Sequence, residues 1–302
     1  MKRYGIFAGF LLVVAGISIL HPSFLSTANI LNIIRQSSVH GVMAVGMTFV
    51  ILTGGIDLSV GSILALTGVI CASLEHAGWP VTLTVLATAL AGAAIGLANG
   101  LVITKGRVTP FVVTLGTMSI ARGFAHIYTA GQPISGFQRD FLYIGAGSIL
   151  GIPLPVAIFF ATLASAAFVL RYTRLGRYIY AIGSNERAAR LAGVNVDIFK
   201  TTAYVASGLT AAIAAVILTS RLNAGESVAG TGYELDVIAS VVIGGTSLMG
   251  GRGSVWGTLV GALLIGTVNN AMNLLEISSY WQLVVRGLII VGAVLADRLR
   301  ET

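Results

Sequence analysis

Long apolar runs that contain no charged residue dominate the chain. Windows that lack Asp, Glu, Lys and Arg over 20 residues or more include 4–34, 76–104, 141–170, 201–220 and 253–275. A helix that rises about 1.5 Å per residue needs about 20 residues to cross about 30 Å of hydrocarbon. The runs lack the sustained alternation of apolar and polar residues that the strands of a membrane barrel require. The pattern therefore predicts an all-α, polytopic membrane protein.

The apolar pattern divides into about ten transmembrane segments, which together form one domain over residues 1–302. We expect these segments at 4–20, 39–53, 57–74, 81–103, 111–128, 152–170, 201–220, 235–249, 255–274 and 282–296. Segments 39–53 and 235–249 hold 15 residues each, about 22 Å of helix, which is too short to cross alone. If each forms a re-entrant hairpin with its neighbour, eight crossings remain. Small residues in "AGAAIGLANG" (91–100) and "GALLIG" (261–266) predict close packing between helices.

The composition agrees with this pattern, and the distribution of charges predicts how the segments are oriented in the membrane. Of the 302 residues, 56% are hydrophobic and 10% are charged, against about 25% charged in soluble domains. With the N-terminus inside, most of the 18 Lys and Arg residues fall in inside segments, as the positive-inside rule requires. We therefore expect both termini in the cytoplasm. This placement explains the net charge of +7 without a nucleic-acid partner.

The N-terminal segment has an alternative interpretation. Lys2 and Arg3 followed by an apolar run to Leu20 resemble a secretory signal peptide. No A-x-A cleavage pattern follows, because the next residues read "HPSFLSTAN". We therefore expect 4–20 to be retained as the first span.

A glycine motif occurs twice, each time where a short segment ends. Gly54-Gly55-x-x-Leu-x-x-Gly at 54–61 matches Gly244-Gly245-x-x-Leu-x-x-Gly at 244–251, with an offset of 190 residues. Unpaired backbone groups at membrane depth must face other protein or a water-filled cavity. Interrupted helices in the two halves of a chain therefore point to a transport pathway, and these four glycines are candidates for it.

Asp57 stands directly after the first glycine pair and is the only fixed charge between Arg35 and Glu75. One interpretation is that it caps the helix that follows, since a carboxylate accepts from the free N–H groups at a helix start. A second is that Asp57 and Ser59 line the pathway or its gate. A third, proton coupling, lacks a second acid or a His in the same span.

Other polar residues within the spans also have two interpretations. Arg122 must face the bundle interior or reach the membrane surface, because a charge in hydrocarbon is costly. Asn269 and Asn273 share one helix face and could form interhelical hydrogen bonds or contact a polyhydroxylated solute. Glu234 and Asp236 open a span, where we expect them to cap the helix.

The longest inside loop, 171–200, carries six of the basic residues. Within it, "SNERAARLAG" starts with Ser184 and Asn185 as candidate N-caps and stops at Gly193, which predicts a short helix. This helix could lie on anionic lipid headgroups or dock to a cytosolic partner.

Several stretches resemble known transport proteins. Ala188-Ala189-x-x-x-Gly193 resembles the A-A-x-x-x-G coupling loop of permease subunits in bacterial ATP-binding-cassette importers. "RLGRYIYAIGSNERAARLAGVNV", "KGRVTPFVVTLGTMSIARG" (105–123) and "NNAMNLLEISSYWQLVVRG" (269–287) resemble the ribose-type sugar permeases within the branched-chain amino acid and ribose permease superfamily. The same holds for 46–68 and 229–266, so the likeness covers nearly the whole chain. Arg187 stands where the coupling loop of that family has a glutamate, and the outer loop 129–151 is short for a ribose permease.

The resemblance implies a translocation subunit with three protein partners: a cytosolic ATPase, a periplasmic sugar-binding protein, and a second permease copy or homologue. It also implies that Asn185, Glu186, Arg187, Ala188, Ala189 and Gly193 couple the ATPase to the spans. The solute would be a monosaccharide such as ribose, with amino acids or nucleosides as alternatives, and no cofactor is implied.

The residues themselves argue against other functions. None of the three lysines fits a phosphate-binding G-x-x-x-x-G-K-[ST] loop, since Phe199 stands where the glycine before Lys200 should be. ATP hydrolysis therefore requires a separate subunit. Cys71 is the only cysteine and the four histidines are dispersed, so no metal site is expected. An ion-coupled carrier remains the competing hypothesis.

Overall fold

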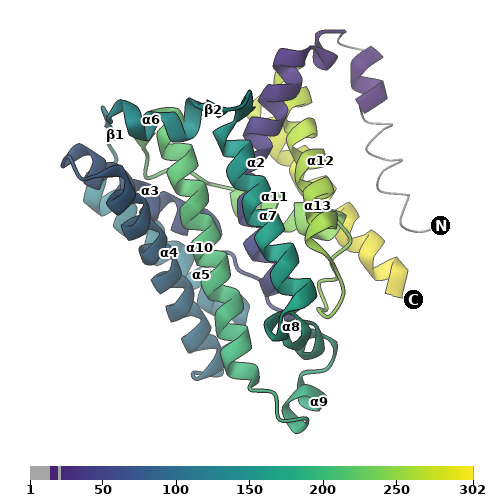
Figure 1. Ribbon diagram of the computed structural model, residues 1–302. Helices are drawn as coiled ribbons and strands as arrows, with labels where there is room; N and C mark the ends of the chain where they lie inside the picture. Colours follow the sequence, from purple (N-terminus) through teal and green to yellow (C-terminus); the bar gives the residue numbers. More distant parts are fainter. Residues whose placement is uncertain (1–13, 20–21, 302) are drawn as a thin grey trace.

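The computed structural model describes residues 14–19 and 22–301, and its helices pack side by side in a single bundle (Figure 1). The helices are η1 (Pro22–Leu25), α2 (Thr27–Leu52), α3 (Val60–His76), α4 (Val81–Thr104), α5 (Pro110–Thr129), α6 (Arg139–Ala146), α7 (Leu154–Tyr172), α8 (Arg174–Ser184), α9 (Glu186–Leu191), α10 (Val196–Leu222), α11 (Tyr233–Ile243), α12 (Val255–Leu274) and α13 (Ser279–Glu301).

Two small antiparallel pairs of strands accompany these helices. Strand β1 (Ile134–Ser135) pairs with β4 (Ala224–Gly225), and β2 (Ser148–Ile149) pairs with β3 (Ile152–Pro153). Strands β1 and β2 lie with α6 at one end of the bundle, while α8 and α9 project at the other end (Figure 1). The prediction of an all-α architecture is confirmed, since the strands hold two residues each.

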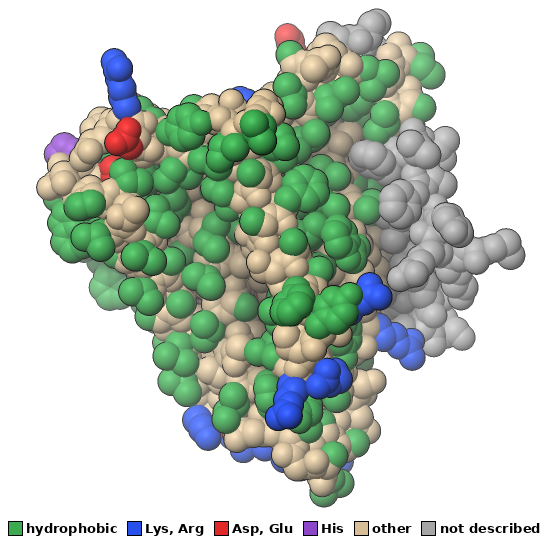
Figure 2. Space-filling model, in the orientation of Figure 1, with side chains coloured by type: hydrophobic (Ala, Val, Ile, Leu, Met, Phe, Trp, Pro, Cys, Tyr) green, Lys and Arg blue, Asp and Glu red, His purple; other side chains and the backbone are tan. Residues whose placement is uncertain are grey.

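The composition of the helices fits a lipid environment. Within the part of the chain that the structure describes, four helices, α4, α7, α10 and α12, are long and apolar enough to cross a membrane. Helix α3 and residues 279–295 of α13 are shorter apolar helices. In Figure 2 hydrophobic side chains cover the broad middle of the molecule, while Lys and Arg gather toward the end that carries α8 and α9. The acidic side chains visible in this view lie at the opposite end.

The N-terminal half differs from the predicted segments in one respect. Helix α2 begins at Thr27, where the hydroxyl of Ser26 accepts from the amide of Asn29 (3.3 Å), and it continues for 26 residues. The expectation of a short segment at 39–53 is therefore wrong, because 26 residues extend about 39 Å. Ser37 and Ser38, just before the predicted start at residue 39, are fully buried inside the bundle. Of the first predicted span, 4–20, only the helical residues 14–19 fall within the described part of the chain.

Helix α11 is short, as the sequence predicts for its segment. It covers 11 residues rather than the 15 of 235–249, which corresponds to about 16 Å. Residues 244–254 follow it as a loop rich in glycine before α12 begins.

Helices α2 and α10 form the centre of the bundle, and α10 packs closely against α4. Gly92, Gly96 and Gly100 of α4 lie against Gly208, Tyr204 and Thr201 of α10, at distances where an added Cβ would overlap the α10 backbone. Such a row of glycines lets two helix backbones approach closely enough for extensive van der Waals contact. The packing role predicted for 91–100 is confirmed.

Candidate functional site: two interrupted helices and a projecting arm

Helices α2 and α11 end in the same way. Gly54 and Gly245 are each the second residue after the last helical one, and both have positive φ (76° and 88°). After α2, the amide of Gly55 donates to the carbonyl of Val50 (3.1 Å). After α11, the amide of Thr246 donates to Val241 (3.2 Å). Both are Schellman motifs, which stop a helix by placing glycine in the left-handed region.

The repeat in the backbone conformation differs by one residue from the repeat in the sequence. The glycine motifs match in sequence with an offset of 190, whereas the two left-handed glycines, Gly54 and Gly245, stand 191 residues apart. Gly55 and Gly244, the other members of the pairs, instead allow close packing. An added Cβ at Gly55 would overlap the hydroxyl of Tyr204, and one at Gly244 would overlap the backbone of Gly257 in α12.

The end of α2 meets the loop that follows α11 at the end of the bundle that carries α8 (Figure 1). The amide of Gly251 donates to the carbonyl of Leu52, the last residue of α2 (2.9 Å). The backbone of Gly183, near the end of α8, lies against both, and an added Cβ there would overlap the Leu52 oxygen and the Gly251 nitrogen. Gly250 lies against Gly54 and Gly183 in the same way. We call Leu52, Gly54, Gly183, Gly250 and Gly251 the glycine junction.

Helix α8 leads directly into the predicted docking helix. Asn185 ends α8 and caps α9, with its side-chain oxygen accepting from the amide of Ala188 (2.9 Å). Gly193 has φ 83°, and the amides of Gly193 and Val194 donate to Arg190 (3.1 Å) and Ala189 (3.1 Å), another Schellman stop. The predicted start and end of this helix are confirmed.

Glu186 anchors α9 to the bundle. Its carboxylate accepts from the ammonium of Lys200 in α10 (2.7 Å) and from the guanidinium of Arg190 (3.2 Å). The hydrogen bond from Lys200, with the further cation at Arg190, lowers the pKa of Glu186 below its ordinary value. Arg190 also reaches Asp197 (3.2 Å), so the return into α10 is fixed as well.

The coupling residues divide into anchors and exposed groups. Ala189 is buried with Ile182 and Val196 in a small apolar cluster beneath α9. Arg187 and Ala188 are exposed, and Leu191 is 90% exposed. This exposure on a projecting helix adds Leu191 to the candidates for a docking contact. The sequence motif did not single it out, because its exposure depends on how α9 projects from the bundle.

Asp57 is fully buried in the break between α2 and α3. Its Oδ1 accepts from the amide of Ser59 (3.0 Å) and from the Ser59 hydroxyl, and its Oδ2 accepts from Ser207 of α10 (2.8 Å). The carboxylate therefore satisfies the first free amide before α3. A cap of the usual kind would instead bond the second or third residue of the helix.

The polar network continues from Ser59 into two further helices. Asn99 of α4 donates to the Ser59 hydroxyl (3.0 Å), and Thr117 of α5 donates to the Asn99 oxygen (2.6 Å). The start of α3 is thus joined by side-chain hydrogen bonds to α4, α5 and α10. In a low-dielectric interior a satisfied network of this kind fixes one arrangement of the helices.

Arg122 holds the loop that precedes α11. Its guanidinium donates to the carbonyls of Ser227 and Ala229 (2.7 Å each) and interacts electrostatically with Glu234. Gly230 in this loop lies against Gly61 in the first turn of α3. The loop therefore dips deep into the bundle, and α11 begins beside the start of α3.

Asp236 does not cap α11, contrary to expectation, since its carboxylate faces neighbouring helices. Its buried carboxylate lies 3.6 Å from Arg286 of α13 and 3.8 Å from His40 of α2. Asn269 donates to it (3.5 Å), and the ring of Tyr233 stacks on His40 with centroids 4.1 Å apart. Asp57, just before α3, and Asp236, in the first turn of α11, are therefore both buried aspartates held by neighbouring helices.

The two predicted asparagines form interhelical hydrogen bonds. Besides Asn269, Asn273 accepts from Gln282 of α13 (3.0 Å). Asn270, between them, exchanges hydrogen bonds with Asn29 of α2 (2.9 and 3.0 Å). In the described ranges 14–19 and 22–301, no group of three or more His, Cys, Asp or Glu side chains could hold a metal ion.

Comparison with known proteins identifies the class. The family described as branched-chain amino acid transport system permease component matches residues 29–294, and the chain belongs to this family. It is 50% identical over 300 residues to the ribose import permease protein RbsC of Haemophilus influenzae, covering 98% of this chain and 93% of that protein.

Two further relatives cover comparable lengths. RbsC of Bacillus subtilis is 49% identical over 303 residues, covering 100% of this chain and 94% of the relative. The L-arabinose ABC transporter permease protein AraH of Azospirillum brasilense is 39% identical over 301 residues, covering 100% and 89%. No solved structure matches the chain.

Proposed function

We propose that this chain is the translocation subunit of an ATP-driven importer that carries a monosaccharide, with ribose as the first solute to test, across the bacterial inner membrane. The near-full-length likeness to ribose import permeases is the observation that carries the proposal. Ribose is preferred over arabinose because identity falls from 50% to 39% between the two groups of relatives. The family description names branched-chain amino acids, but the relatives with the highest reported identity import a sugar.

Residues 171–200 act as the coupling arm in this proposal. An ATPase in the cytosol would grip the exposed side of α9 through Arg187, Ala188 and Leu191, while Asn185, Glu186, Ala189 and Gly193 keep the helix in shape. Movement of the arm would reach α2 and the loop after α11 through the glycine junction. The arm would thus connect the ATPase to α2 and, through the loop that follows α11, to α11 itself.

The solute would pass along the face where α11 begins. Thr231 is exposed, and Arg122 and Glu234 are partly exposed, although the loop packs deep in the bundle against α3. Polar groups at such depth must face water or protein rather than lipid. Half-length helices that start near the middle of the membrane are a feature of transporter pathways. A second permease copy would form the other wall of this path.

The helix lengths favour ten crossings with both termini in the cytoplasm. Helix α2 crosses fully at about 39 Å. The short predicted segment 235–249 would complete its crossing through the loop 223–232, which enters the bundle and leads into α11. Residues 244–254 would then lie at the same membrane surface as the end of α2.

Reconstitution tests the proposed function. The chain, combined with an ATPase and a periplasmic ribose-binding protein of a related importer, should accumulate labelled ribose in proteoliposomes only when ATP is enclosed with the ATPase. The chain alone should accumulate none under a proton or sodium gradient. Uptake driven by an ion gradient without the ATPase would contradict the proposal that a separate ATPase drives transport, and it would support an ion-coupled carrier.

A further inference from the structure

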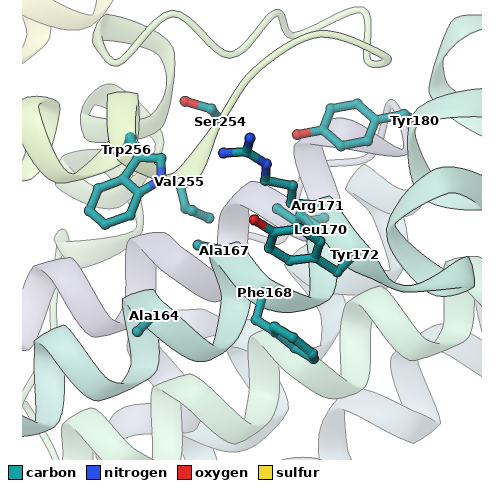
Figure 3. Close-up of a pocket in the computed structure, with 10 residues that line it drawn as sticks. All are labelled: Ala164, Ala167, Phe168, Leu170, Arg171, Tyr172, Tyr180, Ser254, Val255 and Trp256. Carbon is teal, nitrogen blue, oxygen red and sulfur yellow. The ribbon is translucent and has the colours of Figure 1, made fainter.

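A cavity of about 510 Å³ opens between the ends of α7, α8 and α12, away from the proposed solute path. Arg171 and Tyr172 come from the last turn of α7, Trp256 from the first turn of α12, and Tyr180 from α8. Ala164, Ala167 and Phe168 continue its wall along α7. Figure 3 shows the Arg171 guanidinium reaching toward the gap between Trp256 and Tyr180.

The chemistry of the lining changes along the cavity. At one end stands Arg171, whose guanidinium lies 5.4 Å from the ring of Tyr172, and no carboxylate lines the cavity. Within the described ranges Arg171 forms no salt bridge either. At the other end, up to two turns back along α7, the wall is apolar, and Phe168 is 60% exposed. An occupant should therefore carry a negative charge at one end and hydrocarbon at the other.

The position of the cavity selects the occupant. The exposed Tyr172 (62%) and Trp256 (56%) flank it at the helix ends, where aromatic residues mark the boundary between hydrocarbon and headgroups. Basic pockets between membrane helices on the cytoplasmic side bind lipid headgroups. We propose that this cavity binds an anionic phospholipid, with the phosphate on Arg171 and an acyl chain along Ala164, Ala167 and Phe168.

The bound lipid would also touch the coupling machinery. The hydroxyl of Tyr180 donates to the carbonyl of Gly253 (2.9 Å), within the loop that contributes Gly250 and Gly251 to the glycine junction. A lipid in the cavity therefore braces α8 and this loop together. The inference rests on the proposed function only in placing this end of the bundle at the cytoplasmic membrane surface.

Fluorescence quenching provides a test that does not depend on transport. The chain has three tryptophans, and Trp79→Phe with Trp281→Phe leaves Trp256 as the reporter in the cavity wall. The full chain is placed in vesicles that contain phosphatidylglycerol or phosphatidylcholine with brominated acyl chains, which quench tryptophan on contact. Because one basic residue favours an anionic lipid by about fivefold, half-maximal quenching should need about fivefold less brominated phosphatidylglycerol than brominated phosphatidylcholine.

Three variants connect this preference to the cavity. Arg171→Gln should abolish it, and Arg171→Lys should keep it. Arg177→Gln removes a cation at the same end of the bundle that does not line the cavity, and it should leave the preference unchanged. Equal quenching by the two lipids, a preference that survives Arg171→Gln, or a Trp256 that neither lipid reaches would each overturn the proposal. Ribose uptake, measured separately, distinguishes these outcomes from failure of the proposed function.

Discussion

The amide of Gly251 donates a hydrogen bond to the carbonyl of Leu52 over 2.9 Å, and so joins the end of α2 to the loop that follows α11. Gly183 packs against both residues and belongs to α8, within the proposed coupling arm. Three backbones thus meet where no side chain fits between them. Any displacement of α8 would therefore be transmitted directly to α2 and to the loop after α11.

Gly183→Ala should separate ATP hydrolysis from transport. The added methyl would overlap the Leu52 oxygen and the Gly251 nitrogen, and overpacking of this kind costs about 1–3 kcal/mol. We expect ribose uptake to fall on the order of tenfold while the ATPase still co-purifies with the permease. Gly292→Ala in α13, where a Cβ would meet nothing within 4 Å, is the matched control and should retain uptake. Normal uptake in Gly183→Ala would remove the junction from the coupling path.

Leu191→Asp should weaken binding of the ATPase without unfolding the permease. The side chain is 90% exposed on α9, so a carboxylate there is solvated in the free subunit but must be desolvated in a docked complex. Co-purification of the ATPase should drop at least tenfold. Leu150→Asp, at the 98% exposed turn between β2 and β3, is the control and should have no effect. Ala189→Asp, in contrast, would bury its charge and disrupt the arm itself.

Glu186→Gln should destabilise the coupling arm in a manner that depends on pH. The pKa of Glu186 is lowered in the folded arm, so its ion pairs stabilise the arm at any pH above the ordinary glutamate value. This contribution disappears as the pH falls through the lowered pKa. Since the carboxylate is 42% exposed, we expect less than about 1 kcal/mol. Thermal unfolding of parent and variant should differ at pH 7 and converge as the pH falls below the lowered pKa of Glu186, whereas a constant difference would contradict the assignment.

Asp57→Ala should destabilise the protein much more than Asp57→Asn. Alanine leaves the amide of Ser59 and the hydroxyls of Ser59 and Ser207 without their acceptor, at about 1–3 kcal/mol for each buried group left unpaired. Asparagine keeps one oxygen for Ser59, so folding and most transport should survive. Expression level and melting temperature in detergent measure the difference. Asp140→Ala, at an exposed position, should change neither, and equal losses in both Asp57 variants would argue for a role of the charge itself.

Thr231→Cys should react with a membrane-impermeant, charged thiol reagent. Thr231 is exposed in the dipping loop, one residue after Gly230, which packs on α3, and only a water-filled path would make a thiolate available there. The single native cysteine, Cys71, is fully buried and should not react with the reagent. Leu86→Cys on α4, whose parent side chain is 58% exposed, should face lipid and remain unlabelled. An unreactive Thr231→Cys would exclude this face as the path.

Features fixed by local chemistry are the ones that can be read from the sequence. The coupling helix is an example, because Asn185 and Gly193 act as cap and stop through hydrogen bonds within a few residues. The same holds for the break at Gly54, where the Schellman bonds are local. The short length of α11 also follows from its pattern, since glycine closes the segment early.

Features that depend on tertiary partners remained out of reach. Helix α2 extends to Thr27 because Ser37 and Ser38 find buried surroundings, which a hydropathy pattern reads as a polar boundary. Asp236 was expected to be a cap, but its partners come from α2, α12 and α13. Leu191 is conspicuous only once the structure shows how far it projects.

The brevity of α11 bears on how little has to move in a transport cycle. In the proposed path, α11 would close a stretch of about 16 Å, roughly half of the hydrocarbon thickness of about 30 Å. A small tilt or sideways displacement of this short helix would open a stretch of that length. Each cycle of the ATPase would then have to displace one short helix rather than rearrange the whole bundle.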